Sequence, residues 1–272
     1  MCNKGLTMRI FAGILSISGL ICIFVYTRKE QFSWMSMASV LVEGSQATYS
    51  PYPVHPNPHR PARRVLIDLG ANCGNSYSRL KLDFPDMRFD EVHLFEIQPR
   101  ILRVWLEPLR RRDPLVRLHK AAAWVADTTD VFYMDNRKEN PGDDEKWKKA
   151  WPCDLNHARN PYGASSLFAG HRSTMPINVS LVDMGRFLLQ NFVQEDTIWL
   201  KIDIEGAEYV VIRRIAQSGA LCLVDRWFIE WHDPTRLGID VGERHLNRRV
   251  LKWLTAGCPG KSAQGAVVDN WH

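Results

Sequence analysis

Short apolar runs alternate with amphipathic stretches along the chain from Val65 onward. Compact apolar runs bounded by turn residues indicate buried strands, and apolar positions three and four residues apart indicate helices. This alternation predicts an α/β fold, with a mostly parallel twisted sheet and helices on both faces. The predicted strands are 65–69, 91–95, 116–124, 131–134, 177–181, 198–202, 221–223, 227–229 and 266–271. The predicted helices are 76–82, 101–111, 184–192, 207–218 and 246–255, with Asp183 as an N-cap and Gly219 after a C-terminus.

A different pattern precedes this domain. Residues 10–27 are apolar and carry no formal charge, and their number is close to what a membrane-spanning helix requires. We expect a transmembrane signal anchor here, after a tail of residues 1–9; a cleaved signal peptide and a core helix are the alternatives. Residues 28–63, rich in proline in their second half, are expected to form an extended stem. The folded domain then covers residues 64–272.

Composition adds few constraints. The 272 residues are 45% hydrophobic and 24% charged, which is typical of a globular protein. A net charge of +5, without a basic stripe interleaved with aromatic residues, gives no indication of nucleic-acid binding. The six cysteines form no Cys-x-x-Cys pair, so a structural zinc site is not expected. Cys153 and Cys258 are candidates for a disulfide bond in an oxidising compartment.

The first predicted strand ends in a glycine loop, residues 68–74, at the edge where sheets of this kind bind ligands. Gly70 and Gly74 let the backbone turn sharply and approach a ligand, and Asn72 lies between them. The spacing matches neither the dinucleotide pattern Gly-x-Gly-x-x-Gly nor a phosphate-binding Gly-Lys-Ser/Thr loop. A glycine loop preceded by Asp68 suits a cofactor that bears an ammonium and a sulfonium, as S-adenosylmethionine does. An ordinary tight turn is the alternative.

Glu96 directly follows the second predicted strand. A carboxylate at this edge can accept hydrogen bonds from both hydroxyls of a ribose. A solvent-facing carboxylate is the alternative, but together with the glycine loop the position favours ribose binding. Residues 136–162 are polar and contain prolines, and we expect them to form a long loop or a partial lid over the same edge.

A third polar feature is the sequence Lys201-Ile202-Asp203-Ile204-Glu205-Gly206-Ala207-Glu208. An apolar strand runs directly into Asp203 and Glu205, and strand alternation places both on one face with Lys201. Charged side chains that emerge together at a strand end are costly to bury unless they are paired or liganded. Asp203 is therefore a further candidate for cofactor binding, and a structural cluster of salt bridges is the alternative.

In combination, these segments resemble the FkbM-type methyltransferases. The matching motifs occur in the family's order between about Val65 and His232. They are Asp68-Leu69-Gly70-Ala71-Asn72-Cys73-Gly74, His93-Leu94-Phe95-Glu96, Gly163-Ala164-Ser165-Ser166 and the block from Lys201 to Glu208. The resemblance implies a Rossmann-like class I methyltransferase fold, S-adenosylmethionine as the methyl donor, and O-methylation of sugars or polyketide hydroxyls. The sequence departs from the family after Glu96, where Ile97-Gln98-Pro99 replaces the more usual Glu-Pro.

Methyl transfer to a sugar hydroxyl, a poor nucleophile, benefits from a base or a metal ion. The candidate catalytic residues are His232, Asp203 and Glu205. His232 has a pKa suited to accepting a proton near neutrality and is a candidate base, and a structural role for this histidine near a strand end is the alternative. Coordination of a divalent cation by Asp203 and Glu230 is an alternative that the residues leave open. The expected acceptor is a hydroxyl of a sugar or glycan.

The order of anchor, stem and domain is shared with membrane-anchored glycosyltransferases, in which Asp203 and Glu205 would bind the metal of a nucleotide sugar. That alternative gives the glycine loop and Glu96 no role. A non-catalytic binding module with the same fold is a second alternative. We expect a type II single-pass membrane protein whose domain lies in the lumen of the secretory pathway. Glycosylation of the sequon Asn178-Val179-Ser180 would place the domain there, although the sequon lies in a predicted strand.

Overall fold

The computed structural model describes residues 14–17, 20–23, 60–135, 144–150, 153, 173–232 and 267–270. The chain divides into two compact units, Met1–Thr48 and Tyr49–His272. In the first unit, β1 (Ile14–Ile17) and β2 (Leu20–Ile23) pair in antiparallel orientation. The predicted anchor helix over 10–27 is therefore not found at these positions, and the rest of that segment lies outside the described residues. Within the described part of the chain, no helix combines the length and the apolar character that a bilayer crossing needs.

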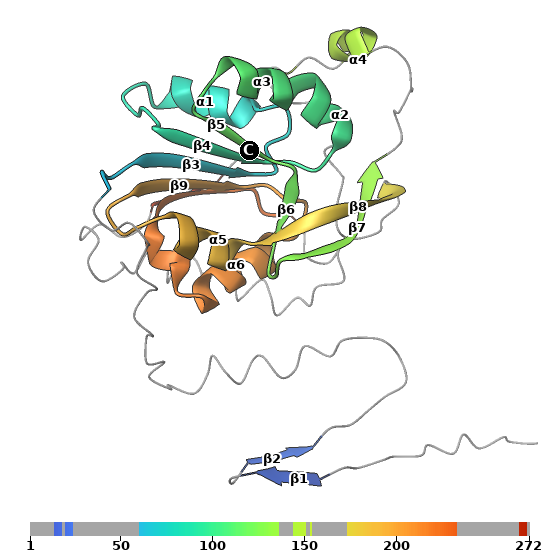
Figure 1. Ribbon diagram of the computed structural model, residues 1–272, viewed down its shortest axis with the longest axis vertical. Helices are drawn as coiled ribbons and strands as arrows, with labels where there is room; N and C mark the ends of the chain where they lie inside the picture. The colour runs from blue at the N-terminus through green and yellow to red at the C-terminus, as the bar shows by residue number, and fades with distance from the viewer. Residues whose placement is uncertain are drawn as a thin grey trace, which may run out of the picture. The chain divides into compact units, whose positions relative to one another are not determined.

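A parallel sheet of six described strands forms the centre of the second unit (Figure 1). Every neighbouring pair in it is parallel, as the apolar runs predict. Across the sheet the order is β11 (Val267–Asn270), β10 (Val224–Ile229), β9 (Thr197–Ile202), β3 (Arg64–Leu69), β4 (Glu91–Phe95) and β5 (Val116–His119). The chain progresses in opposite directions from β3 and from β9, so a switch point lies between their carboxyl ends, where such sheets bind ligands.

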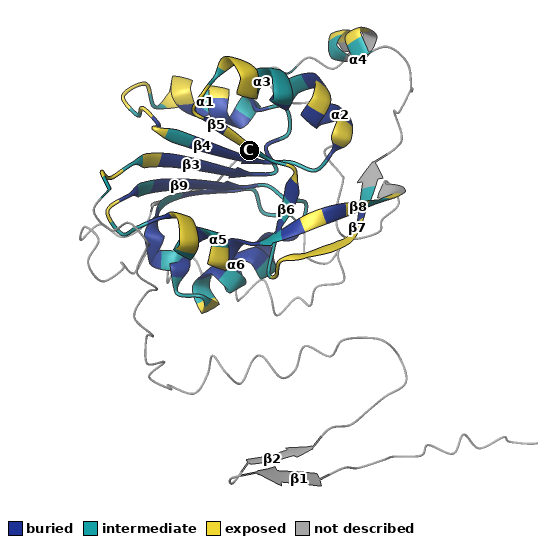
Figure 2. Ribbon diagram, in the orientation of Figure 1, coloured by how far each residue is buried: buried dark blue, intermediate teal, exposed yellow. Residues whose placement is uncertain are grey.

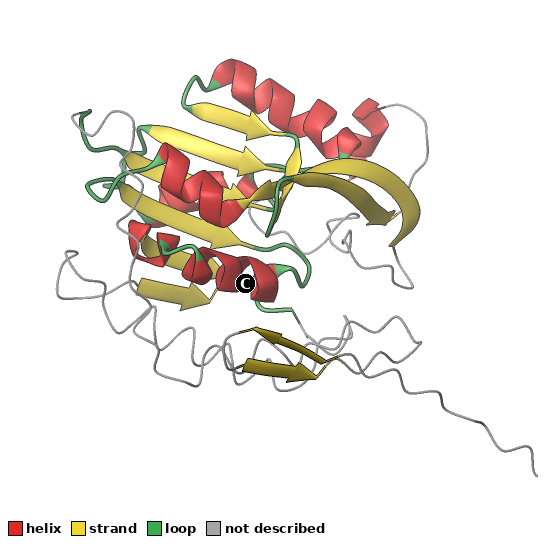
Figure 3. Ribbon diagram, turned by 60° about the horizontal axis from the view of Figure 1, so that its bottom comes forward, coloured by secondary structure: helices red, strands yellow, loops and turns green. Residues whose placement is uncertain are grey.

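Helices cover both faces of this sheet, as predicted (Figures 1 and 3). One face carries α1 (Asn75–Asp83), α2 (Pro99–Ile101) and α3 (Glu107–Arg112), and the other carries α5 (Met184–Asn191) and α6 (Glu208–Gln217). A π-helical turn, Leu102–Leu106, joins α2 to α3, and the Glu107 N–H donates to the carbonyl of Leu102. Pro108 follows and has no N–H to continue the α-helical ladder, which accounts for the wide turn.

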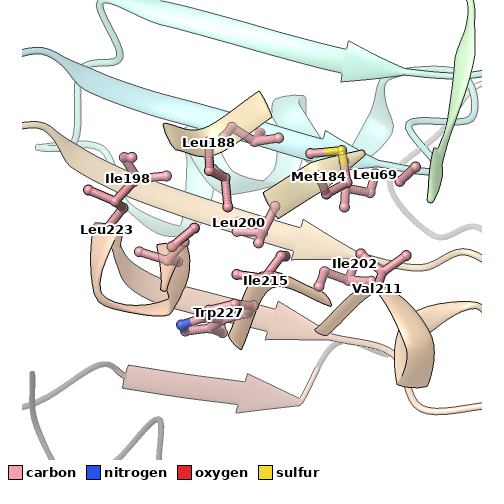
Figure 4. Packing of buried hydrophobic residues seen from close by; sticks show 14 of the residues in the cluster. Leu69, Met184, Leu188, Ile198, Leu200, Ile202, Val211, Ile215, Leu223 and Trp227 are labelled. Atoms are coloured by element: carbon pink, nitrogen blue, oxygen red, sulfur yellow. The ribbon is translucent and has the colours of Figure 1, made fainter. Parts of the chain in front are cut away.

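Alternate residues of the buried strands supply two apolar cores, one on each face (Figure 2). Val65, Ile67 and Leu69 of β3 belong to the cluster that packs against α5 and α6. Leu66, between them, belongs to the cluster on the opposite face, together with Trp199 of β9. The first cluster is centred on Leu200, Ile202, Ile215, Trp227 and their neighbours (Figure 4). This period-two division of a nearly continuous apolar run is expected for a sheet buried on both faces.

A smaller sheet of three described strands lies beside the central one, in the order β6 (Ala121–Trp124), β8 (Ser173–Asp183) and β7 (Thr128–Asp135). The predicted strand 116–124 is thus wrong as a single element, because the chain leaves the central sheet after β5 and starts β6 in the smaller one. The predicted strand 221–223 is also wrong. Gly219, with φ of 82°, turns the chain into a 3-10 helix, Ala220–Leu223.

The expected loop or lid 136–162 contains a short helix, α4 (Asp144–Ala150). Apart from α4 and Cys153, the residues of this segment lie outside the described ones. The predicted helix 246–255 and the motif Gly163-Ala164-Ser165-Ser166 also fall outside the described residues.

Candidate active site

The glycine loop 68–74 leaves β3 at the switch point, and its conformation depends on glycine. Gly70 has φ of 77° and Gly74 has φ of 84°, and Asn72 between them also has a positive φ, 49°. The N–H groups of Gly70 and Ala71 both donate to the carbonyl of Phe95, at 3.1 and 2.9 Å, which fastens the loop to the end of β4. A Cβ on Gly70 would lie 1.9 Å from the carbonyl oxygen of Asp203, so only glycine permits this close approach of the two loops.

Glu96 follows β4 and accepts hydrogen bonds from the glycine loop and from its own turn. Its Oε2 accepts from the N–H of Asn72 at 2.9 Å, and Oε1 accepts from Ile97 at 2.8 Å and from Gln98 at 2.9 Å. Burial raises the pKa of Glu96 against the effect of these three bonds. A carboxylate has about four acceptor directions, so one direction on Oε2 remains for a ligand hydroxyl. Glu96 therefore organises the loop and can still face a ribose.

Lys201 joins the ends of β3 and β9 inside the molecule. Its ammonium lies 3.2 Å from Oδ1 of Asp68, 3.2 Å from Oδ2 of Asp203 and 2.8 Å from the carbonyl of Gly70. Asp68 and Lys201 are fully buried. Burial raises the pKa of Asp68 to about 6, although the charge of Lys201 opposes this shift. Oδ2 of Asp68 has no hydrogen-bond partner among the described residues, which leaves an acceptor beneath the glycine loop.

A second set of acidic side chains surrounds His232, which follows β10. Nε2 of His232 is 3.4 Å from Oε2 of Glu205, 4.0 Å from Oδ1 of Asp203 and 3.9 Å from Oε1 of Glu230. Nδ1 of His232 lies 2.9 Å from Oε1 of Glu208, which is fully buried in the first turn of α6. We name Asp203, Glu205, Glu230 and His232 the carboxylate–histidine cluster.

Alternation does not position Glu205, because β9 ends at Ile202. Glu205 has φ of 55°, a left-handed conformation that few residues other than glycine adopt, and Gly206 follows with φ of 105°. This turn brings the side chain back toward His232. Glu208 stabilises the turn, since its Oε1 also accepts from the N–H of Ile204 at 2.9 Å.

Electrostatic interactions correct one expectation about His232. Burial alone would lower its pKa, but the hydrogen bond and charge of Glu208, with the charges of Glu205 and Asp203, raise it to about 9. The surrounding carboxylates thus favour the protonated ring, contrary to the expected titration near neutrality. Burial also raises the pKa of Glu205 to about 8, against the opposing charge of His232.

A disulfide bond ties the glycine loop to the segment after α4. Cys73 and Cys153 are bonded, with their Cα atoms 5.7 Å apart. The suggested pairing of Cys153 with Cys258 is therefore wrong, because Cys153 is already bonded to Cys73. Cys222 is also disulfide-bonded. Cysteine spacing alone could not identify these bonds, because sequence distance does not show which side chains the fold brings together.

The structure thus gathers the sequence candidates at one edge of the sheet. Residues from the glycine loop and Glu96 form one part, and the carboxylate–histidine cluster forms the other, with Lys201 between them. Sequence reasoning missed Glu208 as the partner of His232. Its position in the quoted motif was the available signal, but an acidic residue in a first helical turn is usually explained by the helix dipole.

Comparison with known proteins agrees with this arrangement. The family model described as the methyltransferase FkbM domain matches residues 68–258, which include the glycine loop, Glu96 and the whole carboxylate–histidine cluster. No curated protein matches the chain, and no solved structure does.

Proposed function

Since the chain belongs to the FkbM methyltransferase domain family, we propose that it transfers a methyl group from S-adenosylmethionine to a hydroxyl of a sugar or glycan. The observation that carries this proposal is the meeting of the glycine loop, Glu96 and a set of carboxylates at one switch point. Doubly wound sheets bind nucleoside cofactors at such a point.

The residues fit this cofactor. Gly70 and Gly74 adopt positive φ values that glycine tolerates, and this conformation packs the loop against Asp203 and Leu109 at the switch point. Glu96 has an acceptor direction for a ribose hydroxyl, and the unpartnered Oδ2 of Asp68 offers a negative charge beneath the loop. The bound cofactor would supply an electrophilic methyl group on a sulfonium. Asp68, Gly70, Asn72, Gly74 and Glu96 would then hold the donor.

The acceptor hydroxyl must lose its proton as the new C–O bond forms. Asp203 and Glu205 lie at the carboxyl end of β9 beside the cradle, each with a side chain 27% exposed, so a bound hydroxyl can reach them. Lys201 connects Asp203 to Asp68, which fixes the distance between the acceptor side and the donor side of the site. Positioning of the two reactants contributes much of the acceleration in such a displacement.

Calorimetry of the full chain with S-adenosylhomocysteine tests the donor site. We expect binding in the wild type and a loss of about tenfold or more in Glu96→Gln, because a charge-assisted hydrogen bond contributes about 1.5–3 kcal/mol. Glu195→Gln, which removes an exposed carboxylate from the turn before β9 at the opposite edge of the sheet, is the matched control and should bind as the wild type does. Binding of a nucleotide sugar without binding of S-adenosylhomocysteine would instead favour a glycosyltransferase.

A methyl-donor assay tests the acceptor. Turnover on glycans, but not on lipids or small hydroxylated metabolites, is the expected result. Activity restricted to a lipid or a metabolite would reject the glycan acceptor and leave the donor site intact.

We also propose that the domain lies in the lumen of the secretory pathway. The Cys73–Cys153 bond supports this location, because disulfides persist in oxidising compartments. Asn178 of β8 is exposed and begins a glycosylation sequon, so a glycan at this site would be sterically accessible. A mass shift that a glycosidase reverses, absent in Asn178→Gln, is expected, whereas free Cys73 and Cys153 thiols in protein from intact cells would contradict the location.

A further inference from the structure

An imidazole and two carboxylates of the carboxylate–histidine cluster lie close enough together to share one metal ion. Asp203, Glu205 and His232 each offer one ligand atom, and these atoms all lie within 4.8 Å of one another. Oε1 of Glu230 lies 3.9 Å from Nε2 of His232, so a fourth oxygen is close by. The residues come from the ends of two adjacent strands, β9 and β10, which hold them at a fixed separation.

His232 is oriented from behind by a buried carboxylate. Its Nδ1 faces Oε1 of Glu208 at 2.9 Å, and its backbone carbonyl accepts a hydrogen bond from the hydroxyl of Tyr209. Nε2 is thereby directed toward Asp203 and Glu205. Histidine ligands of protein-bound metals characteristically have this arrangement, in which a carboxylate accepts the N–H and the second nitrogen faces the metal.

Glu208 supplies a second observation that favours a cation at the cluster. It is fully buried, and its Oε2 has no hydrogen-bond partner among the described residues. Glu208 directly adjoins the cluster, in which Asp203 must also share the ammonium of Lys201 with Asp68. Carboxylates this close together repel one another, and a divalent cation would offset that repulsion.

We propose that Asp203, Glu205 and His232 bind a divalent transition-metal ion, with Glu208 as the carboxylate that orients His232. Two carboxylates with an imidazole favour a first-row ion such as Mn²⁺ over Ca²⁺, which prefers oxygen ligands alone. The binding itself does not depend on the proposed function. Its role does: beside the donor cradle, the ion would coordinate an acceptor hydroxyl and make that hydroxyl easier to deprotonate.

Electron paramagnetic resonance of Mn²⁺ titrated into the full chain tests the site, because bound and free ions give different signals. We expect wild-type binding that weakens at least tenfold in Glu205→Gln and in His232→Gln. Glu208→Gln should weaken it about 10- to 100-fold although all ligands remain, as expected for a residue that orients a ligand. Glu195→Gln, at an exposed position in the turn before β9, is the control and should leave Mn²⁺ affinity unchanged.

Unaltered Mn²⁺ binding in both Glu205→Gln and His232→Gln would overturn the proposal, as would the absence of binding in the wild type. Circular dichroism of each variant separates a lost site from a lost fold. If His232→Gln fails to fold, the Mn²⁺-induced rise in melting temperature decides, since it should occur in the wild type and not in the isosteric Glu205→Gln. Calorimetry with S-adenosylhomocysteine on the same samples distinguishes a failed metal site from a failed donor site.

Discussion

At the scale of single residues, Lys201 explains how the two halves of the candidate site hold together. Its side chain is buried, and burial alone would lower its pKa, but the charges of Asp203 and Asp68 outweigh that effect and raise the pKa. The same ammonium donates to the carbonyl of Gly70. One charge therefore connects the glycine loop with the first residue of the carboxylate–histidine cluster.

Replacing Lys201 with methionine should destabilise the protein by about 3–5 kcal/mol, because it leaves the buried Asp68 without its counter-charge. Urea unfolding measures the loss. Adding Asp68→Asn should restore part of the stability, since it removes the charge that lost its partner. Arg79→Met, at an exposed i,i+4 pair with Asp83, should cost less than about 1 kcal/mol and serves as the control. A similar small cost for Lys201→Met would refute the bridging role.

Position at or just after the carboxyl end of an apolar strand was enough to place Asp68, Glu96 and Asp203 at one edge of the sheet, because parallel strands deliver such residues there. The orientation of Glu205 was not predictable in this way, since it depends on a left-handed turn beyond the end of β9. Glu208 was missed because its burial depends on His232, which arrives from a separate strand.

At the scale of elements, the apolar runs predicted the central sheet well because its inner strands β3, β4 and β9 are buried on both faces. The same criterion failed for residues 116–124, where one apolar run serves two sheets: Val116 pairs with β4, whereas Ala121 pairs with β8. A run gives no signal of a change of partner. The sequence likewise could not show that the glycine loop is bonded to Cys153, because the pairing of two cysteines depends on which segments the fold brings together.

That tether should contribute measurably to stability. Cys73 and Cys153 are separated by 80 positions, and closing a long loop in the unfolded chain stabilises the folded state by about 2–5 kcal/mol. We expect Cys153→Ser to lower stability by this amount in thermal unfolding under non-reducing conditions. The double variant Cys73→Ser/Cys153→Ser should match Cys153→Ser within about 0.5 kcal/mol, because either change removes the same bond. Additive losses would mean that the two cysteines act separately.

At the scale of the whole molecule, stability depends on apolar cores on both faces of one sheet, and a histidine pair is packed into one of them. His119 at the end of β5 stacks on Phe95 with ring centroids 4.2 Å apart, and its Nε2 lies 2.9 Å from Nδ1 of His93. Burial, reinforced by the charge of His93, lowers the pKa of His119 to about 4. The folded protein therefore holds this ring neutral where an unfolded chain would protonate it.

The sign of the resulting pH dependence follows from proton binding. Between about pH 6.5, the pKa of an unperturbed histidine, and about pH 4, the unfolded state binds more protons than the folded state. Above about pH 6.5, His119 is neutral in both states and does not lower the free energy of unfolding. As the pH falls through this window, the free energy of unfolding decreases, because only the unfolded state gains the proton. Glu91, whose pKa is lowered to about 2 chiefly by its hydrogen bond to His93, contributes stability that is lost only at more acidic pH.

His119→Phe should therefore flatten the dependence of stability on pH between about 6.5 and 4.5, because phenylalanine keeps the stacking on Phe95 and does not titrate. Urea midpoints measured across this range for both proteins give the difference directly, and contributions from titrating groups that do not contact His119 cancel in it. The variant loses the interaction with His93, so its stability at pH 7 should be slightly lower. If the two curves instead stay parallel down to pH 4.5, His119 is not the group that makes the fold sensitive to mild acid.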